Sequence, residues 1–433
     1  MPDQLMHFDA RKPLTWMTMI LALALTLIGS WFVVRWYMGN TFAEFLNPEE
    51  NGLEMGRRAV SLAPNDPLTH WRLGEVVHKK LPPDQLGQVV NEYEKAVSLS
   101  PNDYRFWMDL GTALEQVGES ARAEKALRRA VDLAPSYTYP HWYLGNLLLR
   151  AGNYSEAFGE LRRASDADPE LRSQLFNLAW EVYKEDFESL KMAVGTTAAA
   201  RAEFVKYLLG RQRIEDGILL WKTLSETEKR ANLAAGESII GTLVAARRYH
   251  QAADISNDLV PTPAHRVVVG QILDGGFEEK MAPQPKAVFG WQVKSAPQVQ
   301  IGIDPSKGHN GGRSLRFVFQ VPSRVDSFNL SQLLLVEPET YYDFAGYVRT
   351  EKLQSGATPF VEIVDSMDGS VFAASLPTAT GNSDWQLFAM SFKTGAKTEA
   401  VTIRINRGSC GQDSVCPLFG TVWYDDFNLK RRS

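Results

Sequence analysis

Cysteine is scarce: the 433 residues include only Cys410 and Cys416, so no Cys-x-x-Cys metal site occurs. The two stand six positions apart, and Gly411 lets the chain between them turn back. A local disulfide is therefore feasible and would suit an oxidising compartment, whereas in a reducing one the pair would be two free thiols in a loop. We expect the disulfide.

An excess of positive charge is also lacking. The chain carries 46 Lys and Arg against 51 Asp and Glu, without the basic surplus that contacts to a phosphate backbone require. We therefore expect no nucleic-acid partner.

Assembled catalytic motifs are missing as well. The seven histidines are scattered, and no nucleophile elbow or metal-binding His spacing occurs. The run from Gly308 to Gly312 is rich in glycine, but no helical pattern follows it to provide the backbone donors that a phosphate needs. The sequence predicts a protein that is not an enzyme.

One long apolar run is present near the N-terminus. The 21 residues from Leu14 to Val34 carry no charged side chain, and as a helix they can cross a hydrocarbon core of about 30 Å. The run continues through Trp36 and Tyr37 without a small-residue cleavage site, which favours an uncleaved transmembrane anchor over 14–37 rather than a signal peptide.

The flanking charges predict the orientation of this anchor. Arg11 and Lys12 precede it and Arg35 follows, so residues 1–13 are expected in the cytoplasm by a margin of one positive residue. A disulfide in the C-terminal part agrees with this orientation. We expect a single-pass protein of the bacterial inner (cytoplasmic) membrane, with most of the chain extracytoplasmic.

An internal repeat begins after the anchor. Proline recurs at Pro64, Pro101, Pro135 and Pro169, at spacings of 37, 34 and 34. With alanine and Leu-Gly in register, the pattern resembles the tetratricopeptide repeat, a helix-turn-helix unit of 34 residues. We expect these repeats over 48–170, where 48–63 would form a capping half-unit, and degenerate helical repeats over 171–260.

The resemblance to tetratricopeptide repeats implies a concave groove that binds a protein partner. In that family, set positions of the first helix of each unit line the groove. On this chain they are Trp71, Glu75, His78, Lys79, Arg105, Met108, Thr112, Glu115, Gln116, Tyr139, Trp142, Asn146 and Arg150.

Two tryptophans depart from the repeat pattern. His70 and His141 occupy the usual tryptophan position, and Trp71 and Trp142 stand one place later. Each tryptophan is then either an exposed anchor for a partner or tucked back into the helix packing.

The composition changes near residues 261 to 270. Short alternating segments rich in Val, Phe and Thr follow, and they predict an antiparallel β-sandwich over 270–433. The expected strands are 299–303, 314–321, 328–335, 341–350, 360–365, 385–392, 400–406 and 421–430.

Motifs at both ends of this region resemble the calcium-stabilised jelly-roll carbohydrate-binding modules. They are Asp274-Gly275-Gly276-Phe277-Glu278 at its start and Trp423-Tyr424-Asp425-Asp426-Phe427 at its end. The resemblance implies a structural Ca²⁺ on Glu278 and Asp425, to which Asp274 either adds a ligand or caps a turn. The alternative is that these carboxylates are solvated edge residues.

The same resemblance implies aromatic and polar groups that bind a glycan. Sugar rings stack on flat aromatics, and their hydroxyls take hydrogen bonds from charged or amide groups. The candidates are Trp291, Tyr347, Arg349 and Trp423, each of which is equally compatible with packing inside the sandwich.

The sequence thus predicts a multidomain scaffold with a single transmembrane helix, an all-α tetratricopeptide solenoid and an all-β jelly-roll sandwich. Its expected role is in envelope or exopolysaccharide assembly or export, with a protein in the groove and a glycan on the jelly roll. The alternative is a protein-protein assembly factor whose jelly roll is structural or binds protein. A glycan-processing enzyme with an unrecognised site is a third hypothesis.

Overall fold

The computed structural model describes residues 13–47, 50–80, 86–279, 288–294, 299–320, 323–324, 329–408, 410 and 415–432. The chain divides into two compact units, Met1–Gly195 and Thr196–Ser433. Helices make up the first unit, whereas the second contains both helices and the β-sandwich.

The N-terminal helix α1 spans Pro13–Glu44. Within the described part of the chain it is the one helix that is long and apolar enough to cross a membrane. Its last turns are not a linker: Trp36 Nε1 and Asn40 Nδ2 donate hydrogen bonds to Asp66 Oδ2 at 2.6 and 2.9 Å. The end of α1 is therefore part of the first helical hairpin.

Helix α2 (Gly52–Leu62) packs against this end of α1. Gly39 is buried there, and a Cβ added to it would lie 2.7 Å from Ala63 Cβ. The predicted half-unit over 48–63 is thus incomplete, because the helix that pairs with α2 is the continuation of α1 through residue 44. The apolar run concealed this continuation, since it ends at Arg35.

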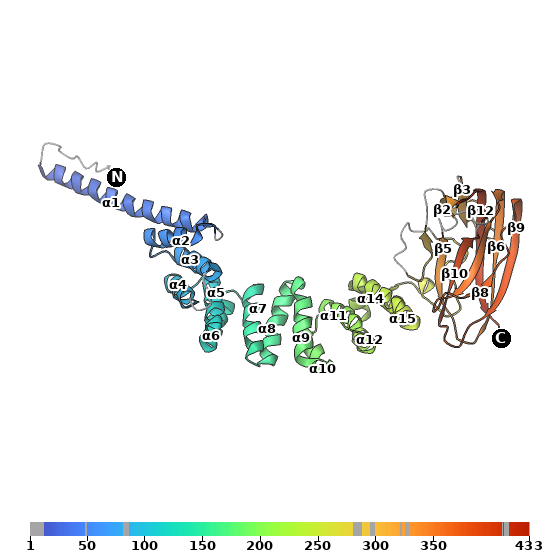
Figure 1. Cartoon of the computed structure of the whole chain (residues 1–433), viewed down its shortest axis with the longest axis horizontal. Helices are drawn as coiled ribbons and strands as arrows, with labels where there is room; N and C mark the ends of the chain where they lie inside the picture. The colour runs from blue at the N-terminus through green and yellow to red at the C-terminus, as the bar shows by residue number, and fades with distance from the viewer. Residues whose placement is uncertain are drawn as a thin grey trace, which may run out of the picture. The chain divides into compact units, whose positions relative to one another are not determined.

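The next six helices form three hairpins, α3 with α4, α5 with α6 and α7 with α8 (Figure 1). Close packing inside a hairpin depends on glycine: a Cβ on Gly111 would lie 2.6 Å from Leu127 Cγ, and one on Gly145 would lie 2.7 Å from Leu161 Cγ. The bounds are α3 Pro67–Lys80, α4 Leu86–Leu99, α5 Tyr104–Gln116, α6 Ser120–Leu133, α7 Thr138–Arg150 and α8 Tyr154–Ala167.

Further helices follow in the region of weaker pattern. The first unit ends with η2 (Pro169–Leu171), α9 (Arg172–Tyr183) and α10 (Phe187–Val194). The second unit begins with α11 Ala198–Gly210, α12 Ile214–Lys222, α13 Glu226–Ala231, α14 Leu233–Ala245, α15 Tyr249–Leu259 and η3 Pro263–His265.

Two antiparallel five-stranded sheets form the sandwich, which is coloured yellow to red in Figure 1. Their strand orders are β1-β5-β10-β7-β8 and β2-β3-β12-β6-β9, and β11 pairs with β4 separately. The bounds are β1 Gln292–Lys294, β2 Val299–Asp304, β3 Ser314–Phe319, β4 Ser323–Arg324, β5 Asn329–Leu335, β6 Tyr341–Ser355, β7 Pro359–Asp365, β8 Val371–Ala374, β9 Gly381–Lys393, β10 Ala400–Arg407, β11 Val415–Cys416 and β12 Leu418–Arg431.

The core of the sandwich is built from the inward residues of both sheets, such as Phe317, Phe344 and Ile403. The predicted fold class, an apolar helix followed by helical repeats and a β-sandwich, is confirmed. The short strands β1, β4, β8 and β11 were not expected, because segments of two to four residues are too short to show alternation.

The last helix of the second unit is attached to the sandwich. Tyr249 Oη donates a hydrogen bond to the carbonyl oxygen of Ser366 at 2.7 Å, and Asn257 exchanges two hydrogen bonds with the backbone of Val267 at 2.7 and 2.9 Å. Through these contacts α15 belongs with the sandwich rather than with the repeats of the first unit.

Candidate functional site

The first unit contains a groove of about 770 Å³ lined by side chains of α3, α4, α5, α7 and α9. Nine of the thirteen predicted groove residues line it. They are Glu75, His78, Lys79, Thr112, Glu115, Gln116, Trp142, Asn146 and Arg150.

Four predicted groove residues, Trp71, Arg105, Met108 and Tyr139, are not among those that line it. Trp71 illustrates the cause, because its Nε1 donates a hydrogen bond to Asp109 Oδ2 at 2.6 Å and its ring packs on Phe106. Of the two alternatives for the displaced tryptophans, Trp71 is tucked into the helix packing and Trp142 faces the groove.

The groove also contains residues that the sequence did not indicate. Tyr93, Asp109 and Tyr143 line it from α4, α5 and α7. Helix α9 adds four side chains with helical spacing, which lay beyond the last clear repeat and could have been found from that spacing alone. They are Gln174, Asn177, Leu178 and Glu181.

Asp109 is the electrostatically unusual group of the groove. Burial raises the pKa of the carboxyl, the hydrogen bond from Trp71 lowers it and the negative charge of Glu75 raises it, and the net pKa is about 6. Two other acids of the groove pair with arginines: Glu75 with Arg72, and Glu115, which accepts two hydrogen bonds from Arg150 at 2.6 and 2.7 Å. A carboxylate so placed is a candidate for contact with a partner.

In the sandwich, the predicted calcium ligands lie near a glycine-rich loop. Asp425 Oδ2 accepts a hydrogen bond from the backbone N–H of His309 at 2.6 Å, and Glu278 reaches Gly311, where an added Cβ would lie 2.0 Å from Glu278 Oε1. Burial raises the pKa of Asp425, and the charges of Asp426 and Glu278 raise it further.

The carboxylate oxygens of this cluster are ligands that suit a hard cation. The side chains alone are too few to complete its coordination. The described residues contain no group of three or more Asp, Glu, His or Cys side chains that could hold a metal ion. Two carboxylates would need backbone carbonyl oxygens of the loop to complete the six to eight oxygens that Ca²⁺ takes. Asp274 instead accepts backbone N–H bonds from Glu278 and Glu279, as a turn cap does.

Two of the predicted glycan-binding aromatics have no open ring face. Trp291 is 7% exposed, lies in the core between Phe277 and Phe427, and donates Nε1 to Asp274 O at 3.1 Å. Trp423 is 3% exposed, and Lys307 Nζ lies 4.3 Å from its ring centroid. The prediction of a stacking role is wrong for both, because chain segments far away in the sequence cover them.

The other two candidates lie together on the outer face of the sheet β2-β3-β12-β6-β9. Tyr347 is half-buried, and the His309 ring stacks on it at 3.5 Å between centroids. Arg349 pairs with Asp384 at 3.3 Å. Their glycan role stays a prediction, although the ring of Tyr347 already has a partner.

The opposite sheet has a polar cluster that the sequence analysis missed. Glu362 Oε1 on β7 accepts hydrogen bonds from Arg404 Nε at 2.6 Å and Asn406 Nδ2 at 3.1 Å on β10. Phe360 lies two residues from Glu362, opposite Asn406. The alternation in Val401-Thr402-Ile403-Arg404-Ile405-Asn406 could have revealed it, since the apolar members face the core.

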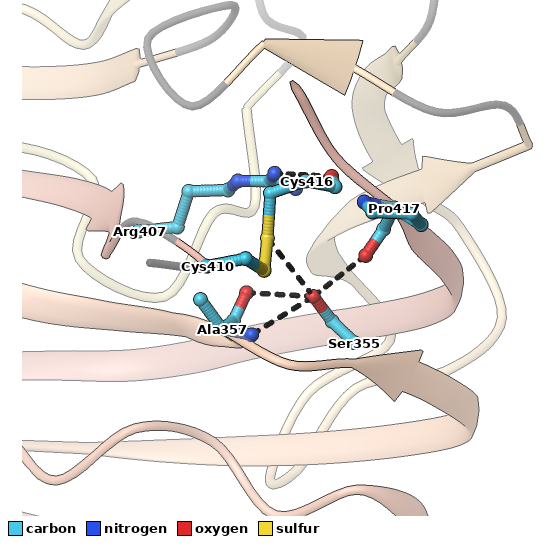
Figure 2. The surroundings of a disulfide bond; sticks show 6 residues. All are labelled: Ser355, Ala357, Arg407, Cys410, Cys416 and Pro417. Carbon is cyan, nitrogen blue, oxygen red and sulfur yellow. Dashed lines mark hydrogen bonds between the residues drawn. A yellow bond between two sulfur atoms is a disulfide. The ribbon is translucent and has the colours of Figure 1, made fainter. Parts of the chain in front are cut away.

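The predicted disulfide joins Cys410 and Cys416 (Figure 2). Ser355 lies beside it: its hydroxyl donates to the carbonyl oxygen of Pro417 at 2.7 Å and accepts a hydrogen bond from the N–H of Ala357 at 3.1 Å. Arg407 donates to the carbonyl oxygen of Cys416. The bond therefore links Cys410, which follows β10, to Cys416 at the end of β11.

Comparison with known families identifies the repeats. The tetratricopeptide repeat model matches residues 90–138 and 109–171. This segment of the chain consists of tetratricopeptide repeats. No curated protein matches the sequence.

Solved structures similar to parts of the chain are of two kinds. YrrB, a tetratricopeptide protein with an unusual peptide-binding site, is 22% identical over 33% of this chain and 73% of its own, with a TM-score of 0.29. A family 4 carbohydrate-binding module is 16% identical over 37% of this chain and 100% of its own, with a TM-score of 0.29.

The xylan-binding CBM22-1 domain of Xyn10C from Paenibacillus barcinonensis is 15% identical over 38% of this chain and 96% of its own, with a TM-score of 0.26. Similarity at these levels does not assign a function. The sandwich described above rests on its own strand order and register.

Proposed function

We propose that this protein is a membrane-anchored, non-enzymatic scaffold of the bacterial envelope that binds a protein in its repeat groove and a glycan on its sandwich. The groove carries the proposal: its lining combines aromatic rings, both signs of charge and amides along four successive helical layers, as recognition of an extended segment requires. The apolar helix α1 and the disulfide support an anchored, extracytoplasmic chain.

The glycan is proposed to bind at the cluster of Phe360, Glu362, Arg404 and Asn406. Arg404 uses only Nε toward Glu362, so among the described residues its other guanidinium nitrogens make no hydrogen bond and can donate to sugar hydroxyls. Phe360 adds a partly exposed ring beside them. Carbohydrate recognition combines these two kinds of contact.

The test is binding of the full chain, in lipid nanodiscs, to a panel of bacterial and plant polysaccharides. Arg404→Ala should weaken binding about tenfold or more by removing donors to the sugar, whereas Arg316→Ala, an arginine on the outer face of the other sheet, should leave it unchanged. A third variant, Tyr347→Ala, tests the outer face of the other sheet. Equal loss of binding in Arg404→Ala and Arg316→Ala, or loss only in Tyr347→Ala, would contradict the proposed site and favour binding of the glycan on the sheet that contains Tyr347.

If the folded protein binds no polysaccharide of the panel, the second candidate function is favoured, a protein-protein assembly factor whose sandwich is structural. The hydrogen bond that joins Tyr249 of α15 to the sandwich favours this alternative, because the sandwich then supports the last helix of the helical region.

We further propose a structural Ca²⁺ held by Glu278 and Asp425 with carbonyl oxygens of the loop. An ion that binds only the folded state raises its stability by mass action. Millimolar CaCl₂ should therefore raise the melting temperature relative to a chelator, and Glu278→Gln should abolish the rise, whereas the neighbouring Glu279→Gln should retain it. An unchanged melting temperature in the parent protein would rule the ion out.

A further inference from the structure

Asp109 stands out among the groups of the repeat groove. Its carboxylate lies at the groove wall and receives one hydrogen bond from a neutral donor, the indole N–H of Trp71 at 2.6 Å. Among the described residues, no Lys, Arg or His side chain lies within ion-pair distance of it. Asp109 is half-buried. A carboxylate partly removed from water without a cation is costly, and that cost is offset when a cation is brought to it.

The other acids around the groove show the contrast. Glu75 pairs with Arg72 at 2.5 Å, and Glu115 pairs with Arg150. The lining carries four acids, Glu75, Asp109, Glu115 and Glu181, against two bases, Lys79 and Arg150, which is a formal charge of −2. The lining as a whole therefore complements a positively charged occupant.

Aromatic rings border the carboxylate. Tyr93 and Tyr143 line the same groove, and the charge of Asp109 contributes to raising the pKa of both phenols after burial, which places the three groups close together. Trp142 lies beside Tyr143 on α7. Aromatic faces stabilise ammonium and guanidinium groups, most strongly where water is partly excluded.

Building on the proposed protein-binding function, we propose that the groove selects an extended protein segment that places a Lys or Arg side chain on Asp109. The cation would form an ion pair with Asp109, and Tyr143, whose side chain is 38% exposed, would flank its alkyl stem and charge. Thr112, Asn146 and Asn177 supply side chains that hydrogen-bond the backbone of an extended segment.

This proposal predicts a pH dependence. Asp109 must be ionised to pair with a cation, and its pKa of about 6 means that the charge is lost below that pH. The groups that face it are Glu75 and His78 from α3, Tyr93 from α4, Arg105 from its own helix and Tyr143 from α7.

The experiment measures binding of the full chain, in nanodiscs, to random octapeptide pools in which one position is fixed as Lys, Arg, Glu or Ala. The parent protein should favour the Lys and Arg pools at pH 7.5 and lose the preference at pH 5. Asp109→Asn, which keeps an acceptor for Trp71, should lower binding of these pools about 10- to 100-fold. Asp132→Asn, an exposed acid outside the groove, is the matched control and should change nothing.

The outcomes separate this proposal from the function on which it rests. Binding without preference for Lys or Arg, a preference for Glu, or a preference that survives in Asp109→Asn would overturn the cation proposal and leave the groove as a protein-binding site. Failure of the parent protein to bind any pool would overturn both. The pH profile of the parent protein tests the proposal even if the variant is poorly folded.

Discussion

The helical repeats and the β-sandwich are held together by contacts of different range in the sequence. In the repeats, Gly111 packs on Leu127 and Gly145 on Leu161, so each close contact joins neighbouring helices. In the sandwich, β12 lies between β3 and β6, and Trp423 stands opposite Arg316 and Arg349. Local damage should therefore stay local in the repeats and spread through the whole sandwich.

The largest effect is expected from Phe427→Ala in the sandwich. The Phe427 ring contacts Phe277, Phe344, Phe388 and Tyr424, and its loss should lower the free energy of unfolding by about 3 to 5 kcal/mol. Hydrogen exchange of the full chain should show both sheets losing protection together. Phe419→Ala, at a ring that is 38% exposed, should cost less than about 1 kcal/mol. Loss confined to β12 would refute cooperative unfolding.

Removal of the disulfide should have the next largest effect. Cys410 and Cys416 close a loop with a sequence separation of 6, and the loop-closure entropy of so short a loop corresponds to about 2 kcal/mol. Reduction, or a Cys410→Ser/Cys416→Ser double variant, should lower the melting temperature of the sandwich and leave the repeats unchanged. A melting shift in the repeats of Met1–Gly195 would show that the two regions are coupled.

A smaller and local effect is expected from Gly111→Ala. The added Cβ would overlap Leu127 Cγ, 2.6 Å away, which should cost about 1 to 3 kcal/mol. Hydrogen exchange should rise in α5, α6 and their neighbours, while β12 keeps its protection. Gly159→Ala in α8 is the matched control: no atom lies within 4 Å of its added Cβ, so it should stabilise the helix by up to about 1 kcal/mol.

The smallest effect concerns pH and a histidine that replaces the usual tryptophan. His70 Nδ1 lies 2.7 Å from Glu92 Oε2, and Nε2 lies 3.0 Å from the carbonyl oxygen of Pro64. Burial lowers its pKa, but these two hydrogen bonds raise it by more, so the net pKa is above 6.5. Stability from the imidazolium is therefore complete below about pH 6.5 and is lost as pH rises through the higher folded-state pKa.

Urea unfolding of the repeats should accordingly show a decrease of less than about 1 kcal/mol between pH 6 and pH 8. His70→Gln should remove this dependence. The second repeat serves as an internal control, because Trp107 Nε1 donates to the carbonyl oxygen of Pro101 at 2.8 Å and does not titrate. A pH dependence that persists in His70→Gln would assign it to another group.

Sequence patterns predicted the elements better than the sites. Nine groove residues were found because position within a tetratricopeptide unit predicts the face of its helix, but Asp109 was missed, since it lies one place beyond Met108 in that scheme. The aromatic candidates of the sandwich were harder to judge. Alternation predicts that Trp423 points away from the core, yet Asp304 accepts its indole N–H at 2.9 Å and Lys307 covers its ring.

The sequence by itself determined the apolar helix, the repeat period and the class of the sandwich, because these depend on spacing between near neighbours in the chain. Tertiary structure decided which side chains are open to a partner. Burial of Trp291, the hydrogen bond from Trp71 to Asp109 and the cluster around Glu362 all depend on residues brought together from separate helices or strands. Such contacts arise from packing, and no local pattern encodes them.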